Sequence, residues 1–116
     1  MKLSLVSDDG HLVHVAAAGR LTQNGVGPFH EPLMELLGQL AYTRHVFLDL
    51  SSADHLDSSG VGWLLTCHKR FREGGGTLTL RDPSPLVINV LRILKLETVL
   101  AIEPSIFAAT GGGGAT

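Results

Sequence analysis

The sequence is poor in cysteine. Its only cysteine, Cys67, has no partner for a disulfide within the chain. There is no CxxC pair and no group of Cys and His residues at the spacing of zinc ligands. We therefore expect neither a disulfide scaffold nor a metal site, and a reducing compartment fits this composition.

Aromatic and charged residues are also scarce. The 116 residues include one Trp, one Tyr and four Phe, so the core must be largely aliphatic. Charged residues make up 17% of the chain against 44% hydrophobic residues, which predicts that a partner covers part of the surface. The net charge of -2, with no basic cluster longer than Lys69 and Arg70, disfavours nucleic acid as that partner.

Long apolar runs and the common cofactor motifs are missing as well. No run approaches the ~20 residues that span a bilayer, and the first ten residues lack the apolar region of a signal peptide. We expect a soluble, cytoplasmic protein without membrane insertion. Neither a phosphate-binding loop nor a dinucleotide-binding glycine pattern occurs, and no cofactor is expected.

Strand and helix patterns alternate along the chain. Residues 3–7 and 11–18 read as a hairpin around an Asp-Asp-Gly turn. Residues 25–42 have helical spacing, although Pro28 and Pro32 leave the helix start open. Residues 45–50 alternate little, as in a central strand covered on both faces. The remaining expected elements are a loop over 51–57, a helix over 58–72 stopped by three glycines, a strand over 77–81, a helix from Ser84 to near Lys95 and a strand over 99–102.

This order, β-β-α-β-α-β-α-β, predicts an α/β fold. Parallel pairings through right-handed crossovers and the antiparallel hairpin give a mixed, mostly parallel sheet of about five strands with helices packed against it. We expect one domain over residues 1–105. The glycine-rich residues 106–116 have little to bury and are expected to form a flexible tail.

Ser58, in the stretch HLDSSGVGWLL, can be read in three ways. As a nucleophile it needs a base and oxyanion donors, and it lacks the G-x-S-x-G elbow, although counting residues does not exclude a Ser/His/Asp set. As a local feature, Asp57 or Ser58 caps the following helix. As a modification site, a helix start favours an added phosphate, while the Asp57 carboxylate beside it would repel that group.

Two segments resemble the STAS domain family of bacterial anti-sigma factor antagonists. They are VFLDLSSADHLDSSGVGWLL and GGGTLTLRDPSPLVINVLRILKLETVLAI, and the resemblance covers roughly residues 3–105. It implies a mixed sheet packed by helices, no catalytic activity, and phosphorylation of Ser58 by an anti-sigma factor that is also a serine kinase. The unphosphorylated form would bind this kinase, and a phosphatase would restore that form.

The resemblance also implies partner contacts around Ser58. Asp57 matches the acidic residue before the acceptor, and Ser59 matches the adjacent hydroxyl. Gly60 and Gly62 match the glycines of the motif, and they read as clearance for a partner surface. Thr22 follows the second strand, where the family commonly has Asp, and this departure concerns the contact with the kinase.

Three further side chains belong to the predicted helix over 58–72. Trp63 falls off the apolar side and is either an exposed anchor for the partner or a partial cover for a loop. Thr66 falls on the polar side, and we count it with the partner contacts. Cys67 is expected to be a small buried side chain.

Sequence reasoning leaves other functions open. The main alternative is a STAS scaffold or assembly subunit, in a signalling complex or a lipid-transporting ABC system, without obligatory phosphorylation. A hydrolase using Ser58 is the third.

Overall fold

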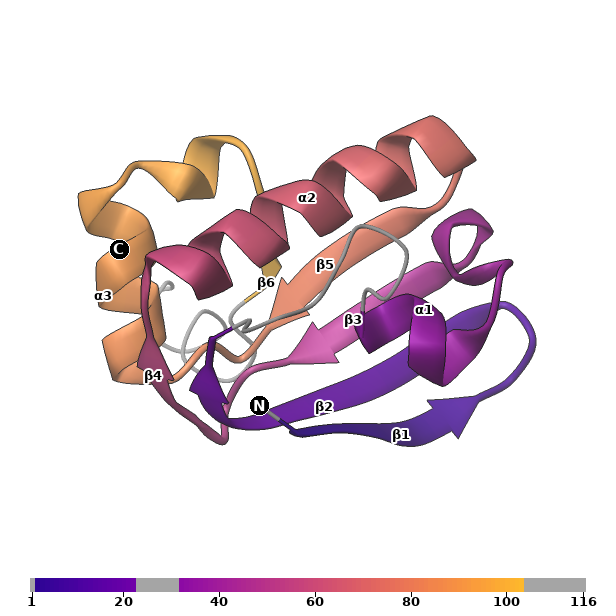
Figure 1. Cartoon of the computed structure of the whole chain (residues 1–116), viewed down its shortest axis with the longest axis horizontal. Helices are drawn as coiled ribbons and strands as arrows, with labels where there is room; N and C mark the ends of the chain where they lie inside the picture. Colours follow the sequence, from indigo (N-terminus) through magenta and orange to yellow (C-terminus); the bar gives the residue numbers. More distant parts are fainter. Residues whose placement is uncertain (1, 23–31, 104–116) are drawn as a thin grey trace.

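The computed structural model describes residues 2–22 and 32–103 (Figure 1). Within these ranges the chain forms a six-stranded sheet, three α-helices and two short 3-10 helices. The strands are β1 (Lys2–Asp8), β2 (Leu12–Leu21), β3 (His45–Asp49), β4 (Ala53–Leu56), β5 (Thr77–Arg81) and β6 (Ala101–Glu103). The helices are α1 (Pro32–Leu37), α2 (Ser58–Gly74) and α3 (Pro85–Ile93), with 3-10 turns η1 (Ala41–Thr43) and η2 (Leu96–Thr98).

The N-terminal hairpin is confirmed. Strands β1 and β2 pair antiparallel. The turn between them is closed by the Asp9 carboxylate, which accepts hydrogen bonds from the backbone N–H of His11 and of Leu12. Gly10 has a φ of 89°, the left-handed conformation for which glycine is suited.

The rest of the sheet is parallel, in the order β1-β2-β3-β5-β6. The central position predicted for residues 45–50 is confirmed, because β3 lies between β2 and β5. The loop predicted over 51–57 is wrong in part: residues Ala53–Leu56 form β4, which pairs with the end of β2. The sheet therefore has six strands where about five were expected.

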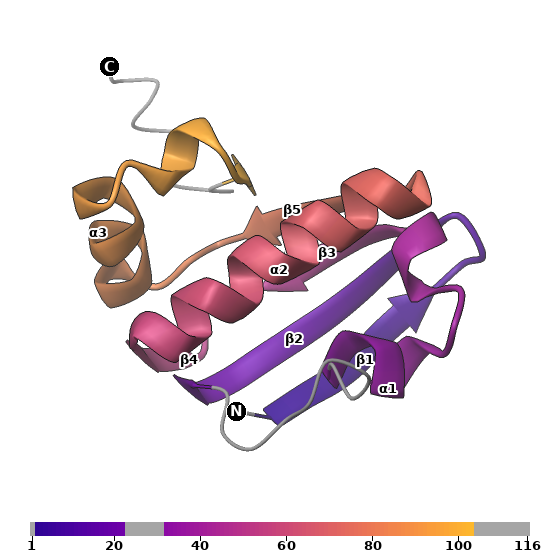
Figure 2. The ribbon, with the colours of Figure 1, turned by 45° about the horizontal axis from the view of Figure 1, so that its top comes forward.

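Helices α1 and α2 lie on one face of the sheet. Figure 2 shows α1 and α2 over the same face, with α3 at the end of the sheet beside β4. In β3, Val46 and Leu48 are buried, whereas Phe47 and Asp49 on the opposite side are only half-buried. The prediction that both faces of this strand are covered is therefore wrong.

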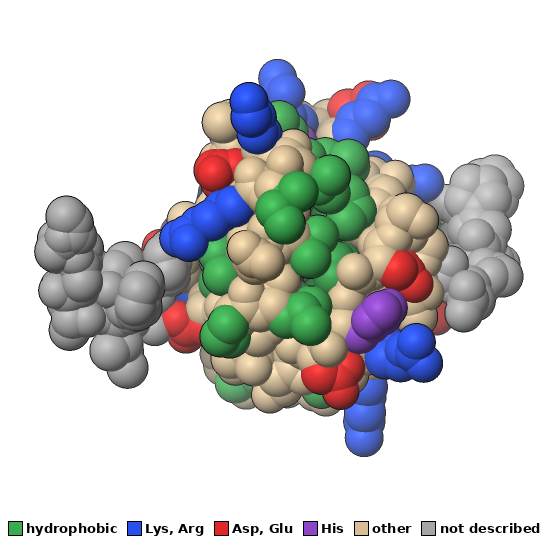
Figure 3. Space-filling view, turned by 90° about the vertical axis from the view of Figure 1, so that its left-hand side faces the viewer, with side chains coloured by type: hydrophobic (Ala, Val, Ile, Leu, Met, Phe, Trp, Pro, Cys, Tyr) green, Lys and Arg blue, Asp and Glu red, His purple; other side chains and the backbone are tan. Residues whose placement is uncertain are grey.

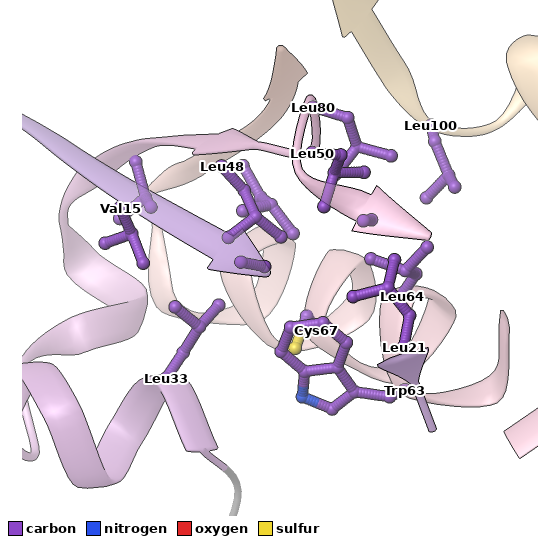
Figure 4. Close-up of a cluster of buried hydrophobic side chains, with 14 of the residues drawn as sticks. Val15, Leu21, Leu33, Leu48, Leu50, Trp63, Leu64, Cys67, Leu80 and Leu100 are labelled. Atoms are coloured by element: carbon purple, nitrogen blue, oxygen red, sulfur yellow. The ribbon is translucent and has the colours of Figure 1, made fainter. Parts of the chain in front are cut away.

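The core lies between this face and the helices (Figure 4). Its members come from the strands and from all three α-helices, and they are mostly aliphatic, as the composition predicts. The largest fully buried side chains are Trp63, Phe71, Leu21, Leu33, Leu48, Leu50, Leu64, Leu80, Leu91, Val13, Val15 and Val46.

Helix ends follow the sequence signals where the structure describes them. Gly75, with a φ of 87°, forms the C-cap of α2. Ser84 is the N-cap of α3 and Pro85 is its first residue, as predicted. The helix expected over 25–42 is shorter: its described part is α1 (Pro32–Leu37), and its predicted start lies outside the described residues, as does the predicted tail over 106–116.

Candidate functional site

The start of α2 lies at the edge of the sheet where the parallel strands end (Figure 1). Leu21, the last residue of β2, pairs with Leu56, the last residue of β4. Because the two strands are parallel, the next residues, Thr22 and Asp57, leave the sheet side by side. Helix α2 begins immediately afterwards, at Ser58.

Asp57, rather than Ser58, caps α2. Its backbone is extended and its Oδ1 accepts a hydrogen bond of 2.9 Å from the backbone N–H of Gly60. The capping interpretation of the motif is thus confirmed, and the carboxylate satisfies a donor that the helix itself leaves without a partner.

Two hydroxyl groups join this cap. Ser59 Oγ donates to Asp57 Oδ1 over 2.7 Å, and Thr22 Oγ1 lies 2.9 Å from Ser59 Oγ. The hydrogen bond from the Ser59 hydroxyl, followed by those from the Gly60 N–H and the Thr22 hydroxyl, holds the pKa of Asp57 well below its usual value. Asp57 therefore stays ionised even at pH values somewhat below its ordinary pKa of 3.8.

Sequence reasoning missed His55 as part of this site. Its Nε2 lies 4.0 Å from Asp57 Oδ2, and the side chain is half-buried. In the β2–β4 pairing, His55 stands opposite Arg20. The only sequence signal was the spacing of His55 and Asp57 in an extended strand, where alternate residues share a side.

Ser58 differs from Ser59 in its surroundings. Ser58 is exposed at the first residue of α2, whereas Ser59 is partly buried and hydrogen-bonded. Gly62 and Thr66 are exposed too, and they follow Ser58 at intervals of four residues. Ser58, Gly62 and Thr66 therefore form one exposed stripe along α2, and a Cβ built on Gly62 meets nothing within 4 Å.

Gly60 has a different role from the one predicted. It is buried, and a Cβ at this position would lie 1.9 Å from the carbonyl oxygen of Leu21. The glycine therefore lets α2 approach the end of β2 inside the molecule. The prediction that Gly60 gives clearance for a partner is therefore wrong. For Gly62, which faces open space, it stays a prediction.

Trp63 is not an exposed anchor. It is 2% exposed and packs in the core with Leu21 and Cys67 (Figure 4). The prediction failed because the buried side of α2 is rotated from the one expected: its buried residues are Gly60, Trp63, Leu64, Cys67 and Phe71. The prediction that Cys67 is a small buried side chain is confirmed.

An apolar patch lies on α3 and the segment that follows it, at the same end of the molecule. The apolar residues Leu86, Val87, Val90, Leu91 and Leu94 have the spacing of one helical stripe, but only Val87 and Leu91 are buried. Figure 3, which views this end, shows hydrophobic side chains gathered at its centre, with both basic and acidic side chains and a histidine around them. We call Leu86, Ile93, Leu94 and Val99 the α3 patch; they are 45%, 70%, 51% and 48% exposed.

Over residues 2–22 and 32–103, no three His, Cys, Asp or Glu side chains are grouped so that they could hold a metal ion. No helix in these ranges is both long and apolar enough to cross a membrane.

Comparison with known proteins decides the family. The family model described as "Mlab, STAS domain" matches residues 4–102, most of the chain. The chain belongs to the STAS domain family. A comparison with curated proteins found no matching sequence.

Solved structures share the fold of this STAS domain. A Thermotoga maritima protein described as an anti-sigma factor antagonist matches with a TM-score of 0.74 at 22% identity. The match covers 95% of this chain and 92% of that protein's chain. Unphosphorylated SpoIIAA, an anti-sigma factor antagonist, has a TM-score of 0.61 at 20% identity, covering 88% and 86%. A STAS domain protein of Planctomyces limnophilus has a TM-score of 0.59 at 18% identity, covering 92% and 93%. At these identities the likeness shows the fold.

Proposed function

We propose that this STAS domain is an anti-sigma factor antagonist, a non-catalytic binding module that is switched by phosphorylation of Ser58. The observation that carries the proposal is the contrast between neighbouring serines. Ser58 is exposed at the helix start, while the hydroxyl of Ser59 is hydrogen-bonded to Asp57. A kinase can reach Ser58 without disturbing the hydrogen bond by which Ser59 supports the Asp57 cap.

The charge of Asp57 makes such a modification disruptive to binding. A phosphoserine at position 58 adds about 1.5 to 2 negative charges next to a carboxylate that stays ionised. A partner surface that fits the unmodified helix start would bind the phosphorylated form more weakly, because burying this added charge at the interface costs desolvation free energy. Phosphorylation would therefore release the partner without unfolding the domain.

The proposed partner is an anti-sigma factor that is also a serine kinase. It would contact the exposed stripe of Ser58, Gly62 and Thr66, with Thr22 and Asp57 at its edge. A phosphatase that acts on phosphorylated Ser58 would return the domain to its binding form. The likeness in fold to SpoIIAA supports this assignment.

Phosphate mapping tests the proposal. The purified domain is incubated with ATP and candidate serine kinases of its own organism, and phosphate is located by mass spectrometry. We expect label on Ser58, loss of label in Ser58→Ala, and unchanged labelling in Ser52→Ala, which removes an exposed serine outside the helix. Stoichiometric phosphate on other residues, with none on Ser58, would overturn the assignment.

A second function is supported by a specific observation. Thr22 stands where the family commonly has a carboxylate, and its hydroxyl lies 2.9 Å from Ser59 Oγ. The matching family model is also described as Mlab, without mention of a sigma factor. A STAS assembly subunit, in a signalling complex or a lipid-transporting ABC system, would use the same stripe without phosphate. Copurification separates the two functions: an ATPase subunit in fixed ratio favours assembly, and a serine kinase favours the switch.

A further inference from the structure

Strand β1 forms one edge of the sheet. It comes first in the strand order, and among residues 2–22 and 32–103 its only partner strand is β2 (Figure 1). Six of its seven residues are exposed. A strand edge of this length presents backbone N–H and C=O groups that can pair with another strand. The edge therefore specifies the kind of occupant that it accepts, which is an extended segment.

The helix side of this edge is apolar and hollowed. Leu3 and Leu5 stand opposite buried residues of β2, so both leucines face the side of the sheet that carries α1 and α2. Leu5 is nevertheless 47% exposed. A hollow of about 310 Å³ lies between β1 and α1, and it is lined by Leu3, Pro32, Glu35 and Leu36. The edge thus offers both an exposed leucine and a hollow that could receive one.

A second copy of β1 fits this edge in an antiparallel pairing centred on Ser4. In that pairing Leu5 of the copy lies opposite Leu3, and the two Ser4 residues lie opposite each other. Since Leu3 and Leu5 share the helix side, the helices of both copies stay on one face of the combined sheet, and the two α1 helices flank the seam. Leu5 of each copy is thereby brought to the hollow of the other. The same surface serves both copies, as a two-fold interface requires.

Charges at the two ends of β1 favour the antiparallel orientation. Lys2 begins the strand, whereas Asp8 ends it and Asp9 follows in the turn. Arg44 forms an ion pair with Asp8, so one of these two carboxylates is balanced and the end of the strand keeps a net negative charge. Antiparallel pairing brings the basic start of each strand toward the acidic end of the other. Parallel pairing would place like charges side by side.

From the open edge, the hollow and the charge pattern, we infer that this chain forms a two-fold dimer through antiparallel pairing of β1 over residues 2–6. The register shift between Leu5 and Ser7 interrupts regular pairing beyond this stretch. The interface is therefore small, and we expect a dimer that dissociates on dilution. The inference does not depend on the proposed function, because it uses no residue of the Ser58 stripe.

Sedimentation velocity of the purified full chain tests the inference. We expect the average mass to rise from one chain toward two chains between about 10 µM and about 1 mM. Ser4→Glu and Ser4→Lys each place like charges opposite each other at the two-fold axis, and each should raise the dissociation constant at least about tenfold. An equimolar mixture of the two variants should dimerise again, because Glu then faces Lys. Ser4 is exposed, so neither change disturbs the core, and Ser52→Glu, at an exposed serine outside the strand, should leave dimerisation unchanged.

The apolar contact is tested separately. Leu5→Ser should raise the dissociation constant at least about tenfold, whereas Leu86→Ser, at a leucine of α3 that is 45% exposed, should leave it unchanged. Ser58→Glu should also leave it unchanged, so a failure of Ser58 phosphorylation and a failure of dimerisation are distinguishable.

Two outcomes would overturn the inference. One is the mass of a single chain at every concentration, which is also the result expected if the edge is filled only by a strand of a different protein. The other is a dimer that persists unchanged in Ser4→Glu and Leu5→Ser, because another surface would then join the copies.

Discussion

The hydroxyl groups of Thr22 and Ser59 lie 2.9 Å apart, although 37 positions separate them in the chain. Ser59 also donates to Asp57, so the two hydroxyls tie the end of β2 to the cap of α2. This arrangement occupies Ser59 and leaves Ser58 exposed at the first residue of the helix. It also keeps a negative charge beside Ser58 at neutral pH.

The lowered pKa of Asp57 predicts a pH-dependent stability. The unfolded chain has the ordinary pKa of 3.8, and the folded chain has a lower one, so the unfolded state binds more protons between the two values. The resulting stabilisation is fully present above 3.8 and is lost as the pH falls toward the folded pKa. We expect Asp57→Asn, which retains a capping side chain, to lower the free energy of unfolding at neutral pH and to converge with the native chain in acid.

Urea unfolding at a series of pH values, followed by the fluorescence of the single tryptophan, measures this difference. Ser59→Ala removes the hydrogen bond that contributes most to the lowered pKa of Asp57. This variant should therefore raise the pKa of Asp57. In its presence, Asp57→Asn should change the free energy of unfolding at neutral pH by less than it does in the native chain. Parallel pH profiles for the native chain and Asp57→Asn would contradict the prediction.

Gly60 and Gly62 should respond in opposite ways to alanine. Gly60→Ala places a methyl group against the Leu21 carbonyl and should cost about 3 kcal/mol or more, because backbone must move. Gly62→Ala meets open space within a helix and should stabilise the domain by about 0.5 to 1 kcal/mol. Thermal and urea unfolding of the two variants provide the measurement. Equal changes in the free energy of unfolding for the two variants would show that stability does not require the close approach of α2 to β2 at Gly60.

The order of elements was predictable because each carries a local signal. The Asp-Asp-Gly turn, the glycines after α2 and the Ser84–Pro85 start of α3 act through neighbouring residues, and all appear in the structure as expected. Strand β4 has no such signal. It forms because Ala53–Leu56 finds the end of β2 as a partner, a contact between distant parts of the chain.

The candidate site was predictable in its residues more than in their roles. The motif narrowed the cap to Asp57 or Ser58, and the structure selects Asp57. Gly60 was expected to give clearance for a partner and Trp63 to lie off the apolar side, although both are buried. Which side of α2 is buried depends on its angle to the sheet, and hydrophobic spacing alone did not determine that angle. The α3 patch was missed for a similar reason: the pattern shows that residues are apolar, and only packing shows which of them are covered.

Ser84 should stabilise α3 through both of its hydroxyl contacts. It accepts from the Val87 N–H and donates to the Ala53 carbonyl. Ser84→Ala should therefore cost about 1 kcal/mol for the lost cap. Hydrogen exchange should increase in α3 more than in β2 and β3, because the change loosens one helix and leaves the central strands paired. Uniform loss of protection throughout the domain would contradict a local role.

Leu91 and Ile93 provide a matched test of how much the stability of the fold depends on the exposed side chains of the α3 patch. Leu91 is fully buried, so Leu91→Ala should cost about 2 to 5 kcal/mol through lost contacts and the cavity left behind. Ile93 is 70% exposed, and Ile93→Ala should change the free energy of unfolding by no more than about 0.5 kcal/mol. Urea unfolding of both variants, at several protein concentrations, separates stability from self-association. A large cost at Ile93 that does not depend on concentration would mean that this side chain stabilises the fold of the single chain despite its exposure.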